Sequence, residues 1–382
     1  MRAIILLTMF FLTAAGGATA AGVKFYPALD GNADARVLLI YSSLDLPTAD
    51  PMLSSFQRRF PGIAVQYEEF LTSEIHDRVV RETDAGEVTA DVVFSSAMDL
   101  QIKLANDGYA QQSNLPLSDS WPRWANWRNT AYALTYEPVV FVYHKPSFAN
   151  MAPPSTRGEL EQWLIRNKDT IQGKVGTYDI ETAGLGFLFF SRDQEQYRDI
   201  WELMAAMGAA GARLHSTTSE ILDRVADGRY IFGYNLVGTY AAEWAVREPN
   251  IGVVLPEDYT IIMSRIGLVP KASAAPDLGG LFLDYFMSQE GQTVMARELH
   301  IAALNPSVED GNTADAMRTA LSGQLRPVPV SPGLLVYLDQ VKRARLIDRW
   351  RSAFDVSVLR NETPVEADDL YVDGDLWPQS WQ

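Results

Sequence analysis

Three short apolar segments near the start of the chain alternate with segments of helical periodicity. Residues 37–41 form a continuous run of Val, Leu, Leu, Ile and Tyr, which is typical of a strand that is buried on both faces. Further strands are predicted at residues 63–67 and 91–94, and helices at residues 52–60 and 74–84. The order strand, helix, strand, helix, strand predicts a parallel sheet covered by helices, so we expect an α/β fold.

Hydroxyl side chains follow each of these strands, at the point where the chain turns toward a helix. In open α/β sheets the carboxyl ends of the strands meet at one edge, and ligands bind there. We therefore expect one polar cleft at this edge. Its candidate ligand-binding residues are Ser42, Ser43, Thr72, Ser95 and Ser96.

The length of the chain indicates two lobes. With 382 residues, of which 47% are hydrophobic, the chain is too long for one core of ordinary size. A second series of helices and strands follows a proline-rich break at Pro153 and Pro154, and the apolar strands before and after this series are predicted to cross between the lobes. The expected division is a first lobe at 21–137, a second lobe at 138–258, a return to the first lobe at 259–330, and a C-terminal helix and tail at 331–382.

The N-terminal residues have the pattern of a secretory signal peptide. Arg2 precedes an apolar stretch at residues 4–12, and small residues lead to Ala20, after which we expect cleavage. The apolar stretch is about half of the roughly 20 residues that cross a bilayer. No cysteine occurs in the chain, so neither a lipid-modified cysteine nor a disulfide is possible. We expect a monomer that diffuses freely in the periplasm.

Charge and motifs exclude several classes of function. The net charge of −16 repels nucleic acid and anionic lipids. This charge could also attract cations, but an acidic surface more commonly serves solubility. The sequence contains no nucleophile elbow, no Walker-type phosphate loop and no His-Glu-x-x-His motif. We therefore predict a binding protein without cofactor or metal rather than an enzyme.

Several segments of the chain resemble one protein family. They are VLLIYSSLD, DVVFSSAMDLQIKLANDGYA, TYEPVVFVYHK, GYNLVGTYA, DYTIIMSRIGLVPKASAAP and FLDYFMSQEGQ. In their order and spacing they are similar to the ferric-type and phosphoglycerate-type periplasmic substrate-binding proteins of ABC importers. The resemblance implies a two-lobed fold with two hinge crossings, which closes over a solute and presents it to a permease in the inner membrane.

The second lobe and the return crossing supply further candidate residues for this cleft. Thr182 and Ala183 come where a strand gives way to a helix, so their backbone N–H groups could bind an anion. Thr218 and Ser219 open another helix, where a hydroxyl either caps the helix or contacts the ligand. Arg265 could bind an anion with two hydrogen bonds, or pair with an acid such as Glu137. The remaining candidates are Tyr234, Asn235 and Tyr259, of which Asn235 has the place in GYNLVGTYA that similar proteins use at the cleft.

The ligand that these residues favour is a small organic anion, phosphorylated or carboxylated. Ferric iron is the alternative, but ferric-binding relatives hold iron with two adjacent tyrosines, and this pair is missing from the segment that contains Tyr234 and Tyr240. Those two residues and Tyr259 remain candidate phenolate ligands. A further alternative is that the closed form reports its ligand to a membrane sensor kinase instead of, or in addition to, a permease.

Overall fold

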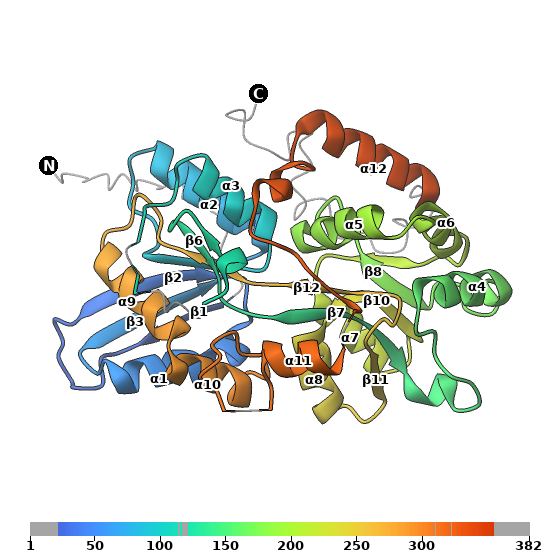
Figure 1. Cartoon of the computed structure of the whole chain (residues 1–382), viewed down its shortest axis with the longest axis horizontal. Helices are drawn as coiled ribbons and strands as arrows, with labels where there is room; N and C mark the ends of the chain where they lie inside the picture. The colour runs from blue at the N-terminus through green and yellow to red at the C-terminus, as the bar shows by residue number, and fades with distance from the viewer. Residues whose placement is uncertain (1–21, 114, 117–120, 310, 322, 355–382) are drawn as a thin grey trace, which may run out of the picture.

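The computed structural model describes residues 22–113, 115–116, 121–309, 311–321 and 323–354. The described chain forms two lobes that lie side by side, each built on a seven-stranded sheet with helices on its faces (Figure 1). The predicted α/β fold with two lobes is therefore confirmed. The predicted signal peptide at 1–20 and the tail after residue 354 lie outside the described residues. No helix in the described part of the chain combines the length and the hydrophobicity needed to cross a membrane.

The first sheet contains the three strands that open the sequence pattern. The strand β2 (Arg36–Ser42) lies between β3 (Ile63–Glu69) and β4 (Val92–Ser95) and is parallel to both. The other strands of this sheet are antiparallel to their neighbours: β1 (Gly22–Tyr26) on one side, and β13 (Ile266–Leu268), β6 (Ala131–Ala133) and β5 (Asn126–Trp127) on the other.

Five long helices surround this sheet. They are α1 (Leu46–Arg59), α2 (Thr72–Asp84), α3 (Met98–Asn106), α9 (Pro276–Met287) and α10 (Gln289–Glu298). Helix α1 begins six residues before the predicted start at residue 52. Pro47 lies in its first turn, where the missing backbone N–H has no helical partner to lose, so this proline does not interrupt the helix.

The second sheet is built around β7 (Glu137–His144). Its order is β14 (Leu325–Pro327), β12 (Thr260–Met263), β7, β10 (Phe232–Val237), β8 (Val175–Tyr178) and β9 (Arg213–His215), and β11 (Ile251–Val254) also pairs with β7. The helices of this lobe are α4 (Arg157–Asn167), α5 (Gly184–Gln196), α6 (Ile200–Ala209), α7 (Thr218–Ala226) and α8 (Gly238–Arg247). Helix α11 (Ala314–Ala320) precedes β14.

Two adjacent crossing segments connect the lobes, as predicted, and the chain crosses again between α10 and β14, which belongs to the second sheet. The first joins β6 to β7 and the second joins β12 to β13, and hydrogen bonds link them: Leu134 N donates to Arg265 O at 3.0 Å, and Arg265 N donates to Thr135 Oγ1 at 2.7 Å. The chain thus returns to the first lobe at Ser264 and Arg265. The expected boundary at residue 259 lies before this point, because β12 still pairs with β7 in the second sheet.

The C-terminal region differs from the single helix expected over residues 331–354. A short 3-10 helix at Pro332–Leu335 comes first, and α12 (Gln340–Phe354) begins only five residues later. In Figure 1, α12 lies over the second lobe next to α5 and α6. It packs on α6 so closely that a Cβ at Gly208 would lie 2.8 Å from the carbonyl oxygen of Phe354.

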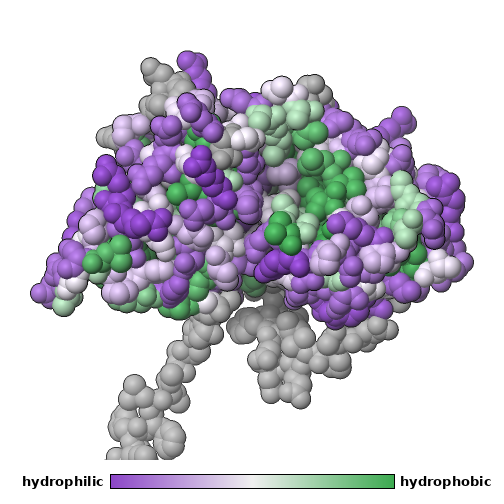
Figure 2. All heavy atoms as spheres, turned by 90° about the horizontal axis from the view of Figure 1, so that it is seen from below, coloured by the Kyte–Doolittle hydropathy of each residue, from purple (hydrophilic) through white to green (hydrophobic). Residues whose placement is uncertain are grey.

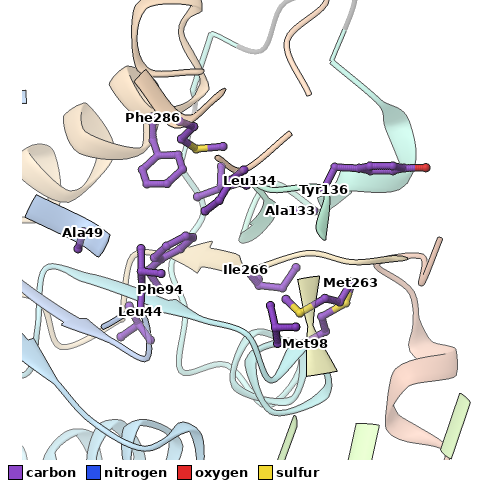
Figure 3. Close-up of a cluster of buried hydrophobic side chains, with 14 of the residues drawn as sticks. Leu44, Ala49, Phe94, Met98, Ala133, Leu134, Tyr136, Met263, Ile266 and Phe286 are labelled. Atoms are coloured by element: carbon purple, nitrogen blue, oxygen red, sulfur yellow. The ribbon is translucent and has the colours of Figure 1, made fainter. Parts of the chain in front are cut away.

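The largest hydrophobic cluster continues across the crossing segments. Figure 3 shows Phe94 and Met98 of the first lobe close to Leu134, Met263 and Ile266 at the two crossings. A second cluster fills the other lobe between its sheet and α4, α5, α6 and α12. The outer surface seen from below is mostly hydrophilic, with an apolar area over the second lobe (Figure 2). The largest cluster also includes residues of α7 and α8 in the second lobe, so the cores of the two lobes are joined through the crossing segments.

Candidate ligand-binding site

A cavity of about 120 Å³ lies between the two lobes at the carboxyl ends of β2 and β4. Six of the predicted residues line it: Ser43, Thr72, Ser96, Thr218, Ser219 and Arg265. The other lining residues are Tyr240, which was considered only as an iron ligand, and eight residues that were not predicted as ligand contacts: Asp45, Glu69, Phe70, Leu71, Tyr178, Leu185, Ser216 and Thr217. Both lobes thus contribute hydroxyl groups to one site.

The serines that follow β2 and β4 divide into two roles. Ser43 and Ser96 line the cavity, where the backbone N–H of Ser96 donates to Ser43 Oγ at 3.1 Å. Ser42 and Ser95 are buried, and they stabilise the turns by accepting hydrogen bonds from Leu44 N at 3.1 Å and Ala97 N at 3.3 Å. The turns fixed by Ser42 and Ser95 therefore hold Ser43 and Ser96 in place.

In the second lobe, α7 is capped by Thr217, the residue directly before the predicted Thr218 and Ser219. Thr217 Oγ1 accepts a hydrogen bond from Glu220 N at 3.3 Å, so Thr218 and Ser219 need not cap the helix. The Thr218 hydroxyl contacts the hydroxyl of Tyr178, and Ser219 Oγ donates to Asp45 Oδ2 at 3.5 Å.

The residues predicted at the start of α5 lie beside the cavity rather than in its lining. Thr182 is exposed and its hydroxyl contacts Ser216 Oγ at 3.2 Å, while Ala183 is the N-cap residue of α5. The lining residue from this helix is Leu185, in its first turn.

Arg265 is almost completely buried at the hinge and reaches the cavity. Its Nε donates to Glu137 Oε1 at 3.1 Å, which is the ion pair that the sequence suggested, and Nη1 donates to Ser43 O at 3.3 Å. The guanidinium group lies over the ring of Tyr240, 5.5 Å from its centre. Nη2 has no hydrogen-bond partner within the described protein. A ligand oxygen could therefore accept a hydrogen bond from this buried donor.

Two carboxylates in the cavity were not predicted. Asp45 is the N-cap residue of α1, and its Oδ1 accepts a hydrogen bond from the Tyr240 hydroxyl of the second lobe at 2.7 Å. Glu69 ends β3, and its Oε2 accepts from Leu46 N at 2.8 Å. Burial, together with the charge of Asp45, raises the pKa of Glu69. In the sequence, Asp45 could have been recognised as an aspartate directly before a helix start that contains a proline.

The N-terminal ends of six helices contribute residues to the cavity. Helices α1, α2 and α3 approach it from the first lobe, and α5, α7 and α8 approach it from the second. Backbone N–H groups at such ends lack helical partners, and the helix dipole makes the local potential positive. The arrangement favours an anionic group on the ligand and also stabilises the carboxylates of Asp45 and Glu69.

Three predicted residues, Tyr234, Asn235 and Tyr259, do not line this cavity. The hydroxyls of Tyr234 and Tyr259 donate to the Asp193 carboxylate, each at 2.6 Å, and the Asn235 amide donates to it as well. Arg157 completes the group through Nε at 3.0 Å from Asp193 Oδ1. The sequence placed these residues in the cleft because they border strands, but α5 brings Asp193 beneath them and holds them in a buried polar network.

Comparison with known proteins assigns the family. Residues 52–320 match the family described as bacterial extracellular solute-binding proteins. The chain belongs to this family. The predicted family is thereby confirmed, as is the prediction of a binding protein rather than an enzyme.

Solved structures are similar to this solute-binding protein along most of its length. The substrate-binding protein of an ABC transporter from Agrobacterium tumefaciens is 60% identical, with a TM-score of 0.86 over 88% of this chain and 100% of that chain. AfuA from Actinobacillus pleuropneumoniae, with fructose-6-phosphate bound, is 15% identical with a TM-score of 0.70 over 85% of this chain and 100% of that one.

Iron-bound HitA from Pseudomonas aeruginosa is 14% identical, with a TM-score of 0.62 over 83% of this chain and 99% of that one. At such identities, AfuA and HitA show a shared fold alone. No curated protein sequence matches the chain.

The tyrosines considered for iron are engaged in other contacts in this solute-binding protein. Tyr234 and Tyr259 donate to Asp193, and Tyr240 donates to Asp45. Burial raises the pKa of all three phenols, which opposes the phenolate form that binds iron. Within the described ranges, no group of three or more His, Cys, Asp or Glu residues is placed to hold a metal ion.

Proposed function

We propose that this solute-binding protein captures a small solute with an anionic group in the periplasm and delivers it to an ABC-type permease of the inner membrane. The observation that carries the proposal is the buried Nη2 of Arg265, which has no protein partner in the described chain and belongs to a residue that lines the cavity. The hydroxyls of Ser43, Ser96, Thr218 and Ser219 and the surrounding helix ends add donors for the same anion.

Delivery requires that the site can open, so water must be able to replace the hydrogen bonds that join the two lobes at the cavity. Asp45 of the first lobe contacts Tyr240 and Ser219 of the second, and Thr48 on α1 donates to Glu243 on α8 at 3.2 Å. Each of these part-buried hydrogen bonds contributes only about 1 kcal/mol net, because water can take the place of either partner. We infer that the lobes separate about the two crossing segments and close again when a ligand bridges them.

The test is to identify the solute that the cell itself supplies. The protein is purified from the periplasm without denaturation, then unfolded, and the released small molecules are identified by mass spectrometry. We expect one chemically unaltered, anion-bearing solute, and we expect cells that lack the gene to take it up more slowly. A released solute without any acidic group, or unchanged uptake of an acidic one, would contradict the proposal.

A further inference from the structure

The cavity contains donors that favour an anion and, in addition, two carboxylates that favour a cation. Building on the proposed function, we propose that the ligand is a small zwitterion, whose acidic group binds at Arg265 and whose protonated amine binds between Asp45 and Glu69. These two carboxylates form the acidic pole of the cavity, and Arg265 with the hydroxyls of Ser43 and Ser96 forms the donor pole.

Among the described residues that line the cavity, two carboxylates stand against one cation, Arg265, whose charge attracts Asp45. Glu137 Oε1 accepts from the Nε of Arg265 at 3.1 Å and from the Thr135 hydroxyl at 2.7 Å, while its buried Oε2 has no hydrogen-bond partner in the described chain. No lysine or arginine forms a salt bridge with Asp45 or Glu69 within the described ranges. Their protein contacts are instead neutral donors: the Tyr240 and Ser219 hydroxyls on Asp45, and Leu46 N on Glu69.

The two carboxylates also act on one another. Asp45 raises the pKa of Glu69, which adds to the effect of burial, so the two negative charges are close enough to repel. An ammonium group between them would remove this repulsion and would donate up to three hydrogen bonds to their oxygens. A ligand that carried only negative charge would instead add to the repulsion.

The donor pole supplies the independent observation that a ligand binds here. Arg265 is 1% exposed, and its Nη2 has no acceptor although Nε and Nη1 both have one. Buried donors of native proteins are nearly always satisfied, so a missing partner in a cavity points to a ligand atom. A ligand amine cannot accept from this donor when protonated, whereas a carboxylate or phosphonate oxygen can.

The volume of the cavity limits the length of the zwitterion. The cavity volume of about 120 Å³ is below the roughly 300–1,000 Å³ of pockets that hold drug-sized ligands. The space suits a short chain between two charged ends and not a nucleotide. The probes are therefore 4-aminobutyrate, butyrate and 1-butylamine, which share a four-carbon chain and carry both charges, only the negative one, or only the positive one.

The experiment is isothermal titration of the dialysed full-length mature protein with each probe. We expect 4-aminobutyrate to bind at least ten-fold more tightly than butyrate or 1-butylamine. The pair 2-aminoethylphosphonate and ethylphosphonate repeats the comparison with a larger acidic group. If only 2-aminoethylphosphonate bound more tightly than its amine-free counterpart, the inference would still be supported. The acidic group of the ligand would then be a phosphonate or phosphate.

Glu69→Gln and its neighbour Glu68→Gln form a matched pair of variants, because both remove one negative charge from β3. Glu68 contacts Gln66 at 2.6 Å and Arg78 at 3.6 Å and does not line the cavity. We expect Glu69→Gln to weaken binding of the zwitterion about ten-fold and to leave binding of its amine-free counterpart unchanged or stronger. Glu68→Gln should leave both unchanged. Asp45→Asn is a second variant with the same expected result as Glu69→Gln.

The outcomes separate this inference from the proposed function. Equal or tighter binding of butyrate than of 4-aminobutyrate, together with equal or tighter binding of ethylphosphonate than of its amine, would overturn the zwitterion and leave anion delivery standing. Equal binding of 1-butylamine and 4-aminobutyrate would overturn both the inference and the proposed function. The acidic group of the ligand would then contribute nothing to binding at the donor pole. Absence of binding by either zwitterion would overturn the inference, while the solute released from the native protein would still decide the proposed function.

Discussion

Arg265 joins the hinge to the cavity. Its backbone links the two crossing segments, and its side chain holds Glu137 and the carbonyl of Ser43. Burial of the Arg265 charge is tolerated because the carboxylate of Glu137 compensates for it. Removing either partner would leave an unpaired buried charge and lower the stability of the fold. The residue therefore influences both stability and ligand affinity.

Arg265→Lys tests the hydrogen bonds of Arg265, because it removes them while keeping the positive charge. Lysine keeps the positive charge but cannot contact Glu137, Ser43 and a ligand oxygen at once, because it lacks the planar fork of donors. We expect ligand affinity to fall at least ten-fold and the free energy of unfolding to fall by about 1–3 kcal/mol. Titration and urea unfolding measure the two quantities. Arg247→Lys, on the exposed face of α8, is the control and should change neither.

A second prediction concerns Asp99, which is buried in α3. Burial raises the pKa of its carboxyl to about 6, although Arg192 and Arg343 partly oppose the rise. Because the folded pKa lies above the unfolded one, the stability that the protonated group provides is complete below pH 4 and is lost as the pH rises through 6. Asp99→Asn should therefore be more stable than the wild type at pH 7.5, by at most about 3 kcal/mol.

Urea unfolding at pH 4 and pH 7.5 tests this prediction for Asp99. The asparagine can still accept the hydrogen bond that Leu100 N donates at 2.9 Å, so the comparison isolates the charge. The gain should disappear at pH 4. Asp107→Asn, at the end of the same helix and in contact with Lys103, should give no gain at either pH. A variant of Asp99 that was equally or less stable at pH 7.5 would contradict the argument.

Among single residues, the sequence identified donors more successfully than carboxylates. Ser43, Ser96 and Arg265 were predicted because they follow apolar strands, which can be recognised without a structure. Asp45 and Glu69 could not be found in this way, because their position depends on the pairing of β3 with β2 and on Tyr240 from the other lobe. Asn235 lies outside the lining of this cavity, and its contact with Asp193 could not be predicted because Asp193 lies on a helix 42 residues earlier in the sequence.

At the scale of the element, the boundaries that the sequence missed are those with exposed or very short segments. The edge strand β1 has three exposed residues among its five, so its apolar pattern is weak. Strands β5 and β6 have two and three residues, too few to show a period. The long buried strands and the amphipathic helices were found because burial on a defined face determines their residue pattern.

The N-cap of α7 provides a test at this scale. Thr217→Ala removes the side-chain acceptor of Glu220 N and should lower the free energy of unfolding by about 1 kcal/mol. Because Thr217 to Ser219 line the cavity, fraying of this helix end should also weaken ligand binding. Thr313→Ala removes an equivalent cap from α11, where Thr313 accepts from Ala316 N at 3.1 Å, and Thr313 does not line the cavity. Equal losses of affinity in both variants would refute the role assigned to the α7 terminus.

At the scale of the whole molecule, the first turn of α5 packs against the first lobe. Gly184 has no side chain, and a Cβ at this position would lie 3.0 Å from Thr72 Oγ1 and 3.5 Å from Leu100 Cδ1. Both of these atoms belong to the first lobe, so the glycine permits a close approach between lobes. A Cβ at Gly280 on α9 would instead meet only Leu115 Cδ2, at 3.8 Å.

Gly184→Ala should therefore disfavour the closed form without harming either core. The added methyl group must displace Thr72 or keep the lobes slightly apart, whereas in the open form alanine replaces a glycine in the first turn of a helix, which does not destabilise it. We expect ligand affinity to fall several-fold while thermal stability without ligand stays equal or rises. Small-angle scattering should show less compaction at a given ligand concentration. Gly280→Ala on α9, whose nearest neighbour is 3.8 Å away, should gain stability and close normally, and a Gly184→Ala protein that did the same would show that closure does not depend on this contact.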